Sequence, residues 1–216
     1  MRDDKNCQWR VARRPVGNVV PEDFLYTEEE IPTPGNREFL LKTYYINLAP
    51  VMRMYMSGES AAGETPLAIG DVIHGRAVAE VIESRHPDFE VGDFVHGQCG
   101  WQTYKVSRGT EQEKIRKLPD IGMSYSVALG TLGMTGFSAY FGFIDCGQPR
   151  HGDVVVVSGA AGGVGTHVVQ LAKIFGCKVI GIAGGREKCE LIRSIGCDVT
   201  IDYKEEDVPA QIAASC

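Results

Sequence analysis

One stretch, from Gly152 to Gly165, constrains the fold of this chain more than any other. It reads G-D-V-V-V-V-S-G-A-A-G-G-V-G, so a turn is followed by four valines and then by four glycines within seven residues. Consecutive valines predict a strand buried on both faces, as in a parallel sheet covered by helices. The glycines allow a tight turn and the close approach of a ligand, and the following helix directs its free N–H groups at that turn. The stretch therefore predicts a strand–turn–helix unit that binds phosphate.

The composition limits the class of protein. The chain has 216 residues, of which 44% are hydrophobic and 23% charged, and its net charge is −6. These values are typical of a globular protein, and an acidic chain without a basic cluster is not expected to bind nucleic acid or an anionic membrane. The N-terminus is too charged for a signal peptide, and no apolar run approaches the length of a membrane span. We therefore expect a cytoplasmic protein.

The cysteines and histidines do not predict a metal site. The seven cysteines are scattered, without a C-x-x-C pair, so reduced thiols are expected rather than a disulfide framework or a zinc site. His74 has no cysteine partner at ligand spacing, and no metal is expected there. Four cysteines occupy apolar positions and are predicted to be small core residues: Cys146, Cys177, Cys189 and Cys197.

The chain changes character near residue 124. Before it, turn-like segments separate likely β segments at 39–47, 72–83 and 94–106, which predicts an antiparallel barrel or sandwich. After it, helices and strands alternate, which indicates βαβ units in a parallel sheet. The predicted helices are 124–132, 136–144, 165–175, 187–194 and 208–214, and the predicted strands are 154–157, 178–183 and 199–202.

The α/β part contains only three predicted strands, whereas a dinucleotide-binding fold has about six. We therefore expect the chain to be part of a longer polypeptide, with the long edge of its first strand exposed.

The end of the second α/β strand indicates which dinucleotide would bind. An acid at this place binds the ribose 2′-hydroxyl in NAD sites, but here the strand is followed by G-G-R-E-K at residues 184–188. Arg186 and Lys188 are cations at a helix start, where they oppose the helix dipole. They could be ordinary solvated residues, but their position favours a role in binding the 2′-phosphate of NADP(H).

Several segments together resemble one family, the zinc-independent medium-chain dehydrogenase/reductases, in the branch of the curcumin, leukotriene, prostaglandin and alkenal reductases. The segments are L-A-P-V-M-R at 48–53, G-D-F-V-H-G and G-W-Q-T-Y within 92–104, L-G-M-T-G-F-S-A-Y at 132–140, G-A-A-G-G-V-G at 159–165, A-G-G-R-E-K-C at 183–189 and D-Y-K at 202–204. The resemblance implies a GroES-like β-barrel domain at 1–123. It also implies that 124–216 is the first half of an NADP-binding Rossmann domain, a doubly wound parallel sheet.

The resemblance also implies the cofactor-binding residues. They are Gly162, Gly163, Val164 and Gly165 at the phosphate turn, Gly184, Lys188 and Tyr203 around the 2′-phosphate, and Met134 and Thr135 near the nicotinamide. Lys188 is indicated both by its charge and by the resemblance, whereas Tyr203 is indicated by the resemblance alone.

The reaction implied by the resemblance is the NADPH-dependent reduction of the carbon–carbon double bond of an α,β-unsaturated ketone or aldehyde. The full-length form of such an enzyme can be a homodimer. This chain departs from the D-P-Y-M-R segment of its relatives, because Ala49 and Val51 replace the acid and the tyrosine. Tyr55 is the nearest phenol, but an ordinary packing role explains it equally well, so no catalytic residue is assigned. The alternative is an NADP(H)-binding fragment or sensor without turnover.

Overall fold

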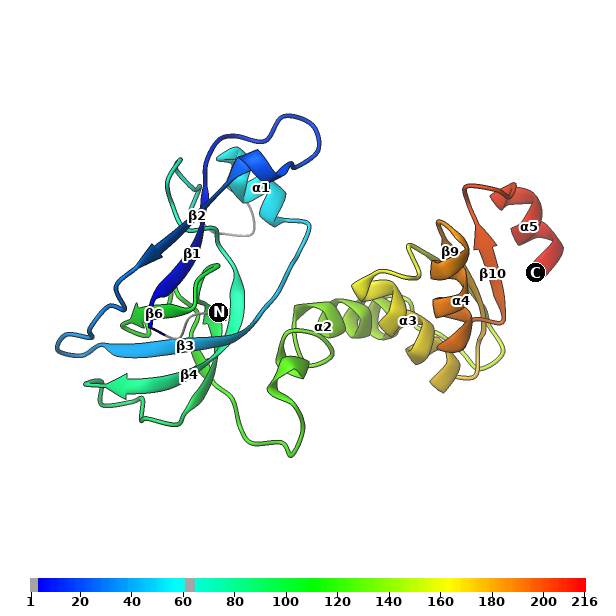
Figure 1. Ribbon diagram of the computed structural model, residues 1–216. Coiled ribbons are helices and arrows are strands. Elements are labelled where there is room, and N and C mark those ends of the chain that lie inside the picture. Colours follow the sequence, from blue (N-terminus) through cyan, green and yellow to red (C-terminus); the bar gives the residue numbers. More distant parts are fainter. Residues whose placement is uncertain (1–3, 61–64) are drawn as a thin grey trace. The chain divides into compact units, whose positions relative to one another are not determined.

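The computed structural model describes residues 4–60 and 65–216. The chain forms two compact units, Met1–Leu129 and Gly130–Cys216, with a mixed α/β architecture (Figure 1). Within the described residues, no helix is long and apolar enough to span a membrane.

The N-terminal unit is built on an open antiparallel sheet with the strand order β6-β3-β4-β5-β7, and β1 pairs with β2 separately. The strands are β1 (Asn6–Val11), β2 (Phe24–Glu29), β3 (Phe39–Ile46), β4 (Arg76–Ser84), β5 (Phe94–Gln98), β6 (Tyr104–Ser107) and β7 (Arg116–Lys117). Three short helices complete the unit: η1 (Pro21–Asp23), α1 (Met52–Ser57) and η2 (Tyr125–Ala128).

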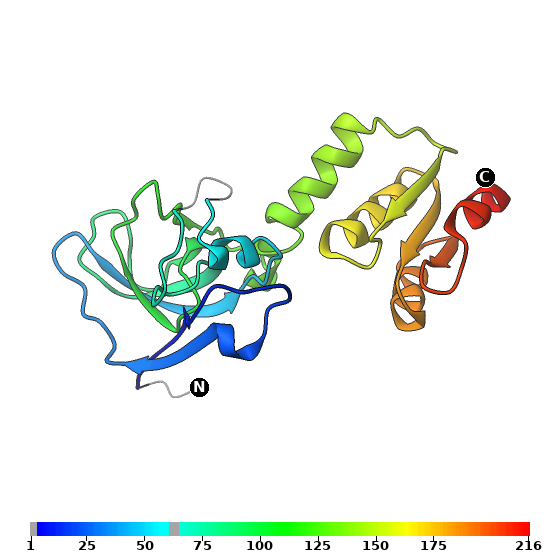
Figure 2. The ribbon, with the colours of Figure 1, turned by 90° about the horizontal axis from the view of Figure 1, so that it is seen from above.

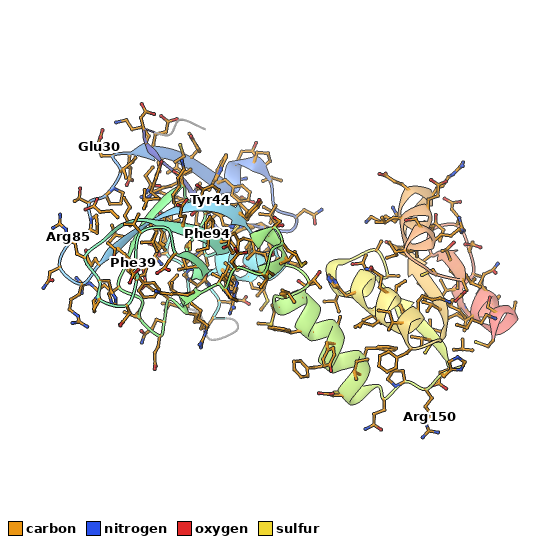
Figure 3. The ribbon with its side chains drawn as sticks, turned by 90° about the horizontal axis from the view of Figure 1, so that it is seen from below. Glu30, Phe39, Tyr44, Arg85, Phe94 and Arg150 are labelled. Carbon is orange, nitrogen blue, oxygen red and sulfur yellow. The ribbon has the colours of Figure 1, made fainter. Side chains whose placement is uncertain are left out.

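Two apolar clusters hold the N-terminal unit together. One lies against the five-stranded sheet, where Phe39, Leu41 and Val95 are fully buried and the ring of Phe39 stacks on Phe89 at 4.1 Å between centroids. Figure 3 labels Phe39 among the side chains of this unit. The other cluster gathers around α1, whose Met56 is almost fully buried. Burial of these apolar side chains is the main favourable contribution to folding of the unit.

The C-terminal unit contains a parallel sheet with the strand order β10-β9-β8. Its strands are β8 (Val154–Ser158), β9 (Lys178–Ala183) and β10 (Val199–Asp202). Its helices are α2 (Met134–Tyr140), the π-helical η3 (Phe141–Cys146), α3 (Gly163–Ile174), α4 (Arg186–Ser194) and α5 (Val208–Ser215). Alternation of strands and helices is confirmed here, and β9 and β10 have the predicted bounds.

Three sequence-based predictions about local structure are wrong. The helix expected at 124–132 is a single 3₁₀ turn, Tyr125–Ala128, and the strand expected at 94–106 is two strands, β5 and β6. Cys146 is exposed at the end of η3, although Cys177, Cys189 and Cys197 are buried as expected. All described cysteines are free in the structure.

The valine strand also differs from its prediction of burial on both faces. Val157 is buried, but Val154 is 43% and Val156 42% exposed. The physical reason is the place of β8 at the edge of the three-stranded sheet, where neither a further strand nor a helix covers these two side chains within the described residues. Among the described residues, β8 is an edge strand of this sheet.

Candidate functional site

The turns that follow β8, β9 and β10 lie together at one end of the sheet of the C-terminal unit. The strands β8, β9 and β10 run parallel, with Ser158 opposite Ile182 and Asp202 opposite Ala183. Their carboxyl ends therefore lie together, as the strands in Figure 2 show. In open α/β sheets, ligands bind in the crevice outside these ends.

At the turn after β8, the start of α3 packs directly against the backbone of the turn itself. Gly159 has a φ of 59°, and the N–H of Ala160 donates to the carbonyl of Ile182 on the neighbouring strand at 3.0 Å. A Cβ on Gly165 would lie 2.8 Å from the Cα of Ala160, so only glycine permits this packing. Gly162 caps α3 without a side chain, and the helix presents its first-turn N–H groups, including that of the exposed Val164, at its amino end.

Met134 and Thr135, at the start of α2, lie beside this glycine turn. A Cβ on Gly163 would lie 3.0 Å from the Cγ2 of Thr135, so the two segments are in close contact. Met134 is 57% exposed and available to a ligand. The structure thus brings together the residues proposed for the phosphate turn and for the nicotinamide end.

His167 links the same two segments, a role that sequence reasoning missed. Its Nδ1 lies 2.6 Å from the carbonyl oxygen of Gly163, and its Nε2 lies 3.0 Å from the hydroxyl oxygen of Thr131. Because a carbonyl only accepts, Nδ1 carries a proton and donates to Gly163, while Nε2 forms the second hydrogen bond with the Thr131 hydroxyl. The sequence indicated this contact only through the spacing of four residues between Gly163 and His167.

Gly184 and Tyr203 are in direct contact. A Cβ on Gly184 would lie 2.6 Å from Cε1 and 2.7 Å from the hydroxyl oxygen of the Tyr203 ring, so the ring occupies the space that the missing side chain leaves. The N–H of Tyr203 donates to the carbonyl of Ala183 at 3.1 Å, while its side chain remains 58% exposed. The Tyr203 phenol therefore lies next to the turn that follows β9.

Asp202 fixes these two turns and was also missed by the sequence analysis. Its Oδ1 accepts hydrogen bonds from the backbone N–H of Gly185 at 2.9 Å and of Lys204 at 3.1 Å. These bonds, that from Gly185 first, hold the pKa of the carboxyl below its usual value. Asp202 is therefore ionised at neutral pH, with Oδ1 directed at backbone N–H groups of both turns.

The two cations after β9 differ in their surroundings. Arg186 donates from Nε to the carboxylate of Glu190, one helical turn further along α4, at 2.7 Å. Lys188 is exposed, and no described residue forms an ion pair or hydrogen bond with its ammonium group. Of the two residues that the sequence indicated for a 2′-phosphate, Lys188 is the one whose charge is not already paired.

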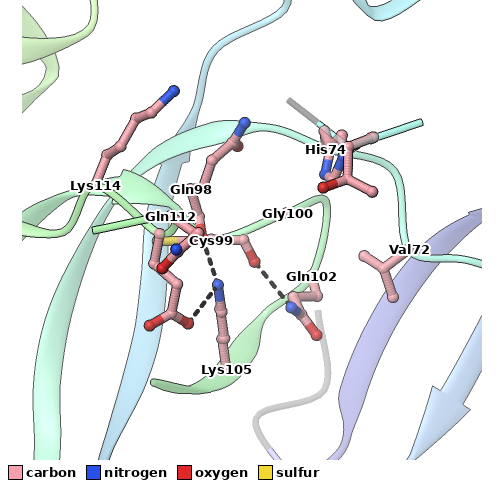
Figure 4. Close-up of a pocket in the computed structure, with 11 residues that line it drawn as sticks. Val72, His74, Gln98, Cys99, Gly100, Gln102, Lys105, Gln112 and Lys114 are labelled. Atoms are coloured by element: carbon pink, nitrogen blue, oxygen red, sulfur yellow. Dashed lines mark hydrogen bonds and ion pairs between the residues drawn. The ribbon is translucent and has the colours of Figure 1, made fainter. Parts of the chain in front are cut away.

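The N-terminal unit contains a polar cavity of about 320 Å³, shown in Figure 4. The ammonium of Lys105 is held there by the carbonyl of Gln98 at 2.5 Å and by the carboxylate of Glu113 at 3.0 Å. Burial raises the pKa of the Cys99 thiol to about 12, so this thiol is protonated and a poor nucleophile at neutral pH.

His74 lines this cavity with its Nε2 2.8 Å from the carbonyl oxygen of Thr65. In the described part of the chain, no three His, Cys, Asp or Glu side chains are grouped so that they could hold a metal ion. The donor set of a zinc site is therefore not present among these residues.

The segment that departs from the relatives lies at α1. Ala49 and Val51 pack against the apolar cluster of this helix, and Tyr55 is 7% exposed with its ring edge-on to His74 at 5.4 Å. Ala49 and Val51, which stand where the relatives carry an acid and a tyrosine, therefore have packing roles.

Comparison with known proteins agrees with this arrangement. Residues 7–115 match the family model described as the N-terminal domain of oxidoreductase, and residues 163–216 match the model described as zinc-binding dehydrogenase. The NADPH-dependent curcumin reductase of Escherichia coli (strain K12) is 44% identical over 98% of this chain and 61% of its own length. Prostaglandin reductase 1 of Oryctolagus cuniculus is 38% identical over 91% of this chain and 54% of its own length.

A solved structure shows the same fold. The crystal structure of CurA from Vibrio vulnificus in complex with NADPH is 42% identical, with a TM-score of 0.87, over 97% of this chain and 61% of that chain. This chain therefore spans less than two thirds of the length of the relatives that it matches. The matches confirm the resemblance: the chain belongs to the medium-chain dehydrogenase/reductase family, in the branch that includes the curcumin and prostaglandin reductases.

Proposed function

We propose that the C-terminal unit binds NADP(H), and that the protein uses it to reduce the carbon–carbon double bond of a small α,β-unsaturated ketone or aldehyde. The observation that carries the cofactor assignment is the turn after β9. It has no acid at the end of the strand for a ribose hydroxyl, its Gly184 contacts the ring of Tyr203, and Lys188, whose ammonium is unpaired, follows four residues after Gly184. An ammonium and a phenol in this arrangement suit a 2′-phosphate.

Two further groups of residues support this proposal. The first-turn N–H groups of α3, at Gly163, Val164 and Gly165, would hold the pyrophosphate, with Gly162 leaving space beside it. Met134 and Thr135 would contact the nicotinamide ring, since Thr135 already lies against Gly163. This assignment supports a GroES-like domain at 1–123 and the first half of a Rossmann domain at 124–216 as the domain organisation.

When bound, NADPH supplies a hydride to the β-carbon of the substrate. Catalysis then depends on hydrogen-bond donors directed at the carbonyl oxygen, where negative charge develops, and on a proton that reaches the α-carbon. His167, which ties Thr131 to Gly163, would keep the α2 segment in register with the phosphate turn during this step. The names of the curcumin and prostaglandin reductases support the class of reaction.

A second candidate is an NADP(H)-binding protein without turnover, and one observation favours it. Ala49 and Val51 pack against apolar side chains where relatives carry an acid and a tyrosine, so this segment offers no donor to a substrate oxygen at those positions. Both candidates predict the same cofactor site and differ only in turnover.

The experiment that separates the candidates uses the protein encoded by the complete reading frame that contains these residues. NADPH consumption is followed with a set of conjugated ketones and aldehydes, and with their saturated counterparts as controls. The reductase proposal expects oxidation of NADPH with the conjugated compounds only. Cofactor binding without oxidation would support the sensor, and absence of NADPH binding by folded protein would contradict both.

A further inference from the structure

A second cavity in the N-terminal unit has a different character from the polar one. It has a volume of about 440 Å³ and lies among β1, β2, β3 and the segment before β6. Four aromatic residues line it: Trp9, Tyr26, Tyr44 and Trp101. This size and lining suit a small flat molecule better than an ion or a peptide. All of these residues belong to the N-terminal unit, whereas the proposed cofactor residues belong to the C-terminal unit.

Two buried polar atoms on the lining residues have no hydrogen-bond partner. Among the described residues, only three buried side-chain nitrogen or oxygen atoms lack one, and two of them are the Nε1 of Trp101 and the Oγ1 of Thr43. Both residues line this cavity. An indole N–H can only donate, so it requires an acceptor oxygen, and a buried donor without one destabilises the empty state.

The indole of Trp101 is held firmly although its N–H is unpaired. Its ring is parallel to that of Phe24, with an interplanar angle of 5° at 6.0 Å between centroids. A Cβ on Gly75 would lie 2.5 Å from Cδ1 and 2.9 Å from Nε1, so the ring edge rests on the glycine backbone. The backbone N–H of Trp101 donates to Ile73 at 2.9 Å. The unpaired donor is therefore part of the packed wall of the cavity.

Charges near the aromatic walls restrict the ligand further. The hydroxyl of Tyr26 donates to the carboxylate of Glu28 at 3.1 Å, and that of Tyr44 donates to Glu80 at 2.8 Å. Carboxylates beside the walls disfavour an anion. The Trp101 N–H requires an acceptor atom on the ligand, and an uncharged molecule with an oxygen supplies one without bringing a negative charge near these carboxylates.

We propose that this cavity binds a small, planar, uncharged aromatic molecule that carries a carbonyl oxygen. The oxygen accepts hydrogen bonds from the Trp101 indole N–H and the Thr43 hydroxyl, and the ring packs among Trp9, Tyr26 and Tyr44. The site is independent of the proposed function, because none of these residues belongs to the unit that carries the proposed cofactor turn.

The tryptophans make this proposal directly testable. The sequence contains two tryptophans, Trp9 and Trp101, and both line the cavity. Tryptophan fluorescence and the two indole N–H signals in a ¹H–¹⁵N NMR spectrum therefore report on this site alone. The probe is indanone, a fused aromatic ketone without a reducible conjugated alkene, and the control is indane, which has the same ring system without oxygen.

We expect indanone to cause a saturable change in both signals, with the Trp101 N–H proton moving downfield as it gains an acceptor. Indane should bind about 10- to 100-fold more weakly, because both hydrogen bonds to the oxygen are lost. The variant Thr43→Val should weaken indanone binding several-fold and leave indane binding unchanged. Trp9→Phe, which retains both donors, is the matched control and should retain the preference for indanone.

Three results would overturn the proposal. One is a change that does not saturate, as for a cavity that holds only water. Another is equal binding of indanone and indane by the wild-type chain. The last is an unchanged affinity for indanone in Thr43→Val, with circular dichroism showing that the variant is folded. Thr43→Val keeps the shape of the side chain, so this last measurement does not require a Trp101 variant to fold.

Discussion

Lys188 and Arg186 lie on the same turn of α4, but only one of them has a free charge. Arg186 is paired with Glu190, whereas no described residue pairs with Lys188. A lysine at a helix amino end opposes the helix dipole, so its position is unfavourable until an anion binds. We therefore expect the discrimination between NADPH and NADH to depend on Lys188.

We predict that Lys188→Ala weakens NADPH binding about 10- to 100-fold and leaves NADH binding nearly unchanged. The magnitude corresponds to the loss of one charge-assisted hydrogen bond to the 2′-phosphate, about 1.5–3 kcal/mol. Arg186→Ala is the matched control, because its charge is already engaged by Glu190, and its effect should stay within about twofold. Dissociation constants from fluorescence titration measure both, and a larger effect for Arg186→Ala would reverse the assignment.

The contact between Gly184 and Tyr203 predicts coupled effects of two substitutions. A methyl group at Gly184 would overlap the ring of Tyr203, so Gly184→Ala should displace the phenol and weaken NADPH binding several-fold. In a Tyr203→Ala background, the same substitution should have little further effect, since the overlapping atoms are gone. A double-mutant cycle on NADPH affinity measures this coupling, and fully additive effects would mean that the two residues act separately.

At the scale of elements, the junction of β8 and α3 depends on glycine for packing as well as for ligand access. The helix begins so close to the turn that Gly165 has no space for a side chain, with Ala160 on the opposing backbone. Backbone atoms cannot move aside as the end of a long side chain can, so substitution here strains the whole strand–turn–helix unit.

We expect Gly165→Ala to destabilise the chain by about 1–3 kcal/mol, the usual cost of overpacking. For a unit of this size each kcal/mol lowers the melting temperature by about 4–8 °C. Gly142→Ala is the control, because a Cβ at Gly142 meets no atom within 4 Å. Thermal melting followed by circular dichroism compares the two variants, and equal melting temperatures would contradict the packing described for the turn.

An ion pair and a hydrogen bond at one carboxylate link α3, β9 and the turn before β10. They make the stability of the C-terminal unit depend on pH. The carboxylate of Asp198 accepts from the ammonium of Lys173 at 2.8 Å and from the backbone N–H of Val179 at 2.7 Å. The hydrogen bond from Lys173 is the main reason that the pKa of Asp198 is lowered below its usual 3.8. Its stabilising contribution is therefore complete above about pH 4 and is lost as the pH falls through the lowered pKa in the folded state.

Asp198→Asn should consequently lower the melting temperature at neutral pH. The difference between the variant and the wild type should shrink below about pH 4, because the wild-type carboxyl is then protonated and neutral like the amide. Melting curves across this range measure the difference. A gap that stays constant from neutral to acidic pH would show that Asp198 acts through packing and not through its charge.

At the scale of the whole molecule, the sequence predicts what depends on local pattern. The bounds of β9 and β10 were correct because short β-branched runs lie between clear turn signals. The pair β1–β2 was not predicted, since Phe24–Glu29 is largely exposed and its charged end resembles a loop. Exposure of Val154 and Val156 depends on which strands flank β8, and the run of four valines carries no information about that.

The residues of the candidate site also divide into those that the local sequence indicates and those whose role depends on the fold. Gly162 to Gly165 and Lys188 could be identified from spacing and charge. Asp202 and His167 could not, because their roles arise from hydrogen bonds to backbone atoms of other segments, at Gly185 and at Gly163 with Thr131. Such contacts become visible only when the strand ends are brought together in the fold.

The most direct test is calorimetric titration, with NADPH and with NADH, of the protein encoded by the complete reading frame that contains these residues. We predict saturable binding of NADPH with an affinity at least about tenfold higher than that for NADH, since Lys188 and Tyr203 would meet only the 2′-phosphate of the former. Equal affinities for the two dinucleotides, or no binding of NADPH by protein that circular dichroism shows to be folded, would contradict the proposed cofactor site.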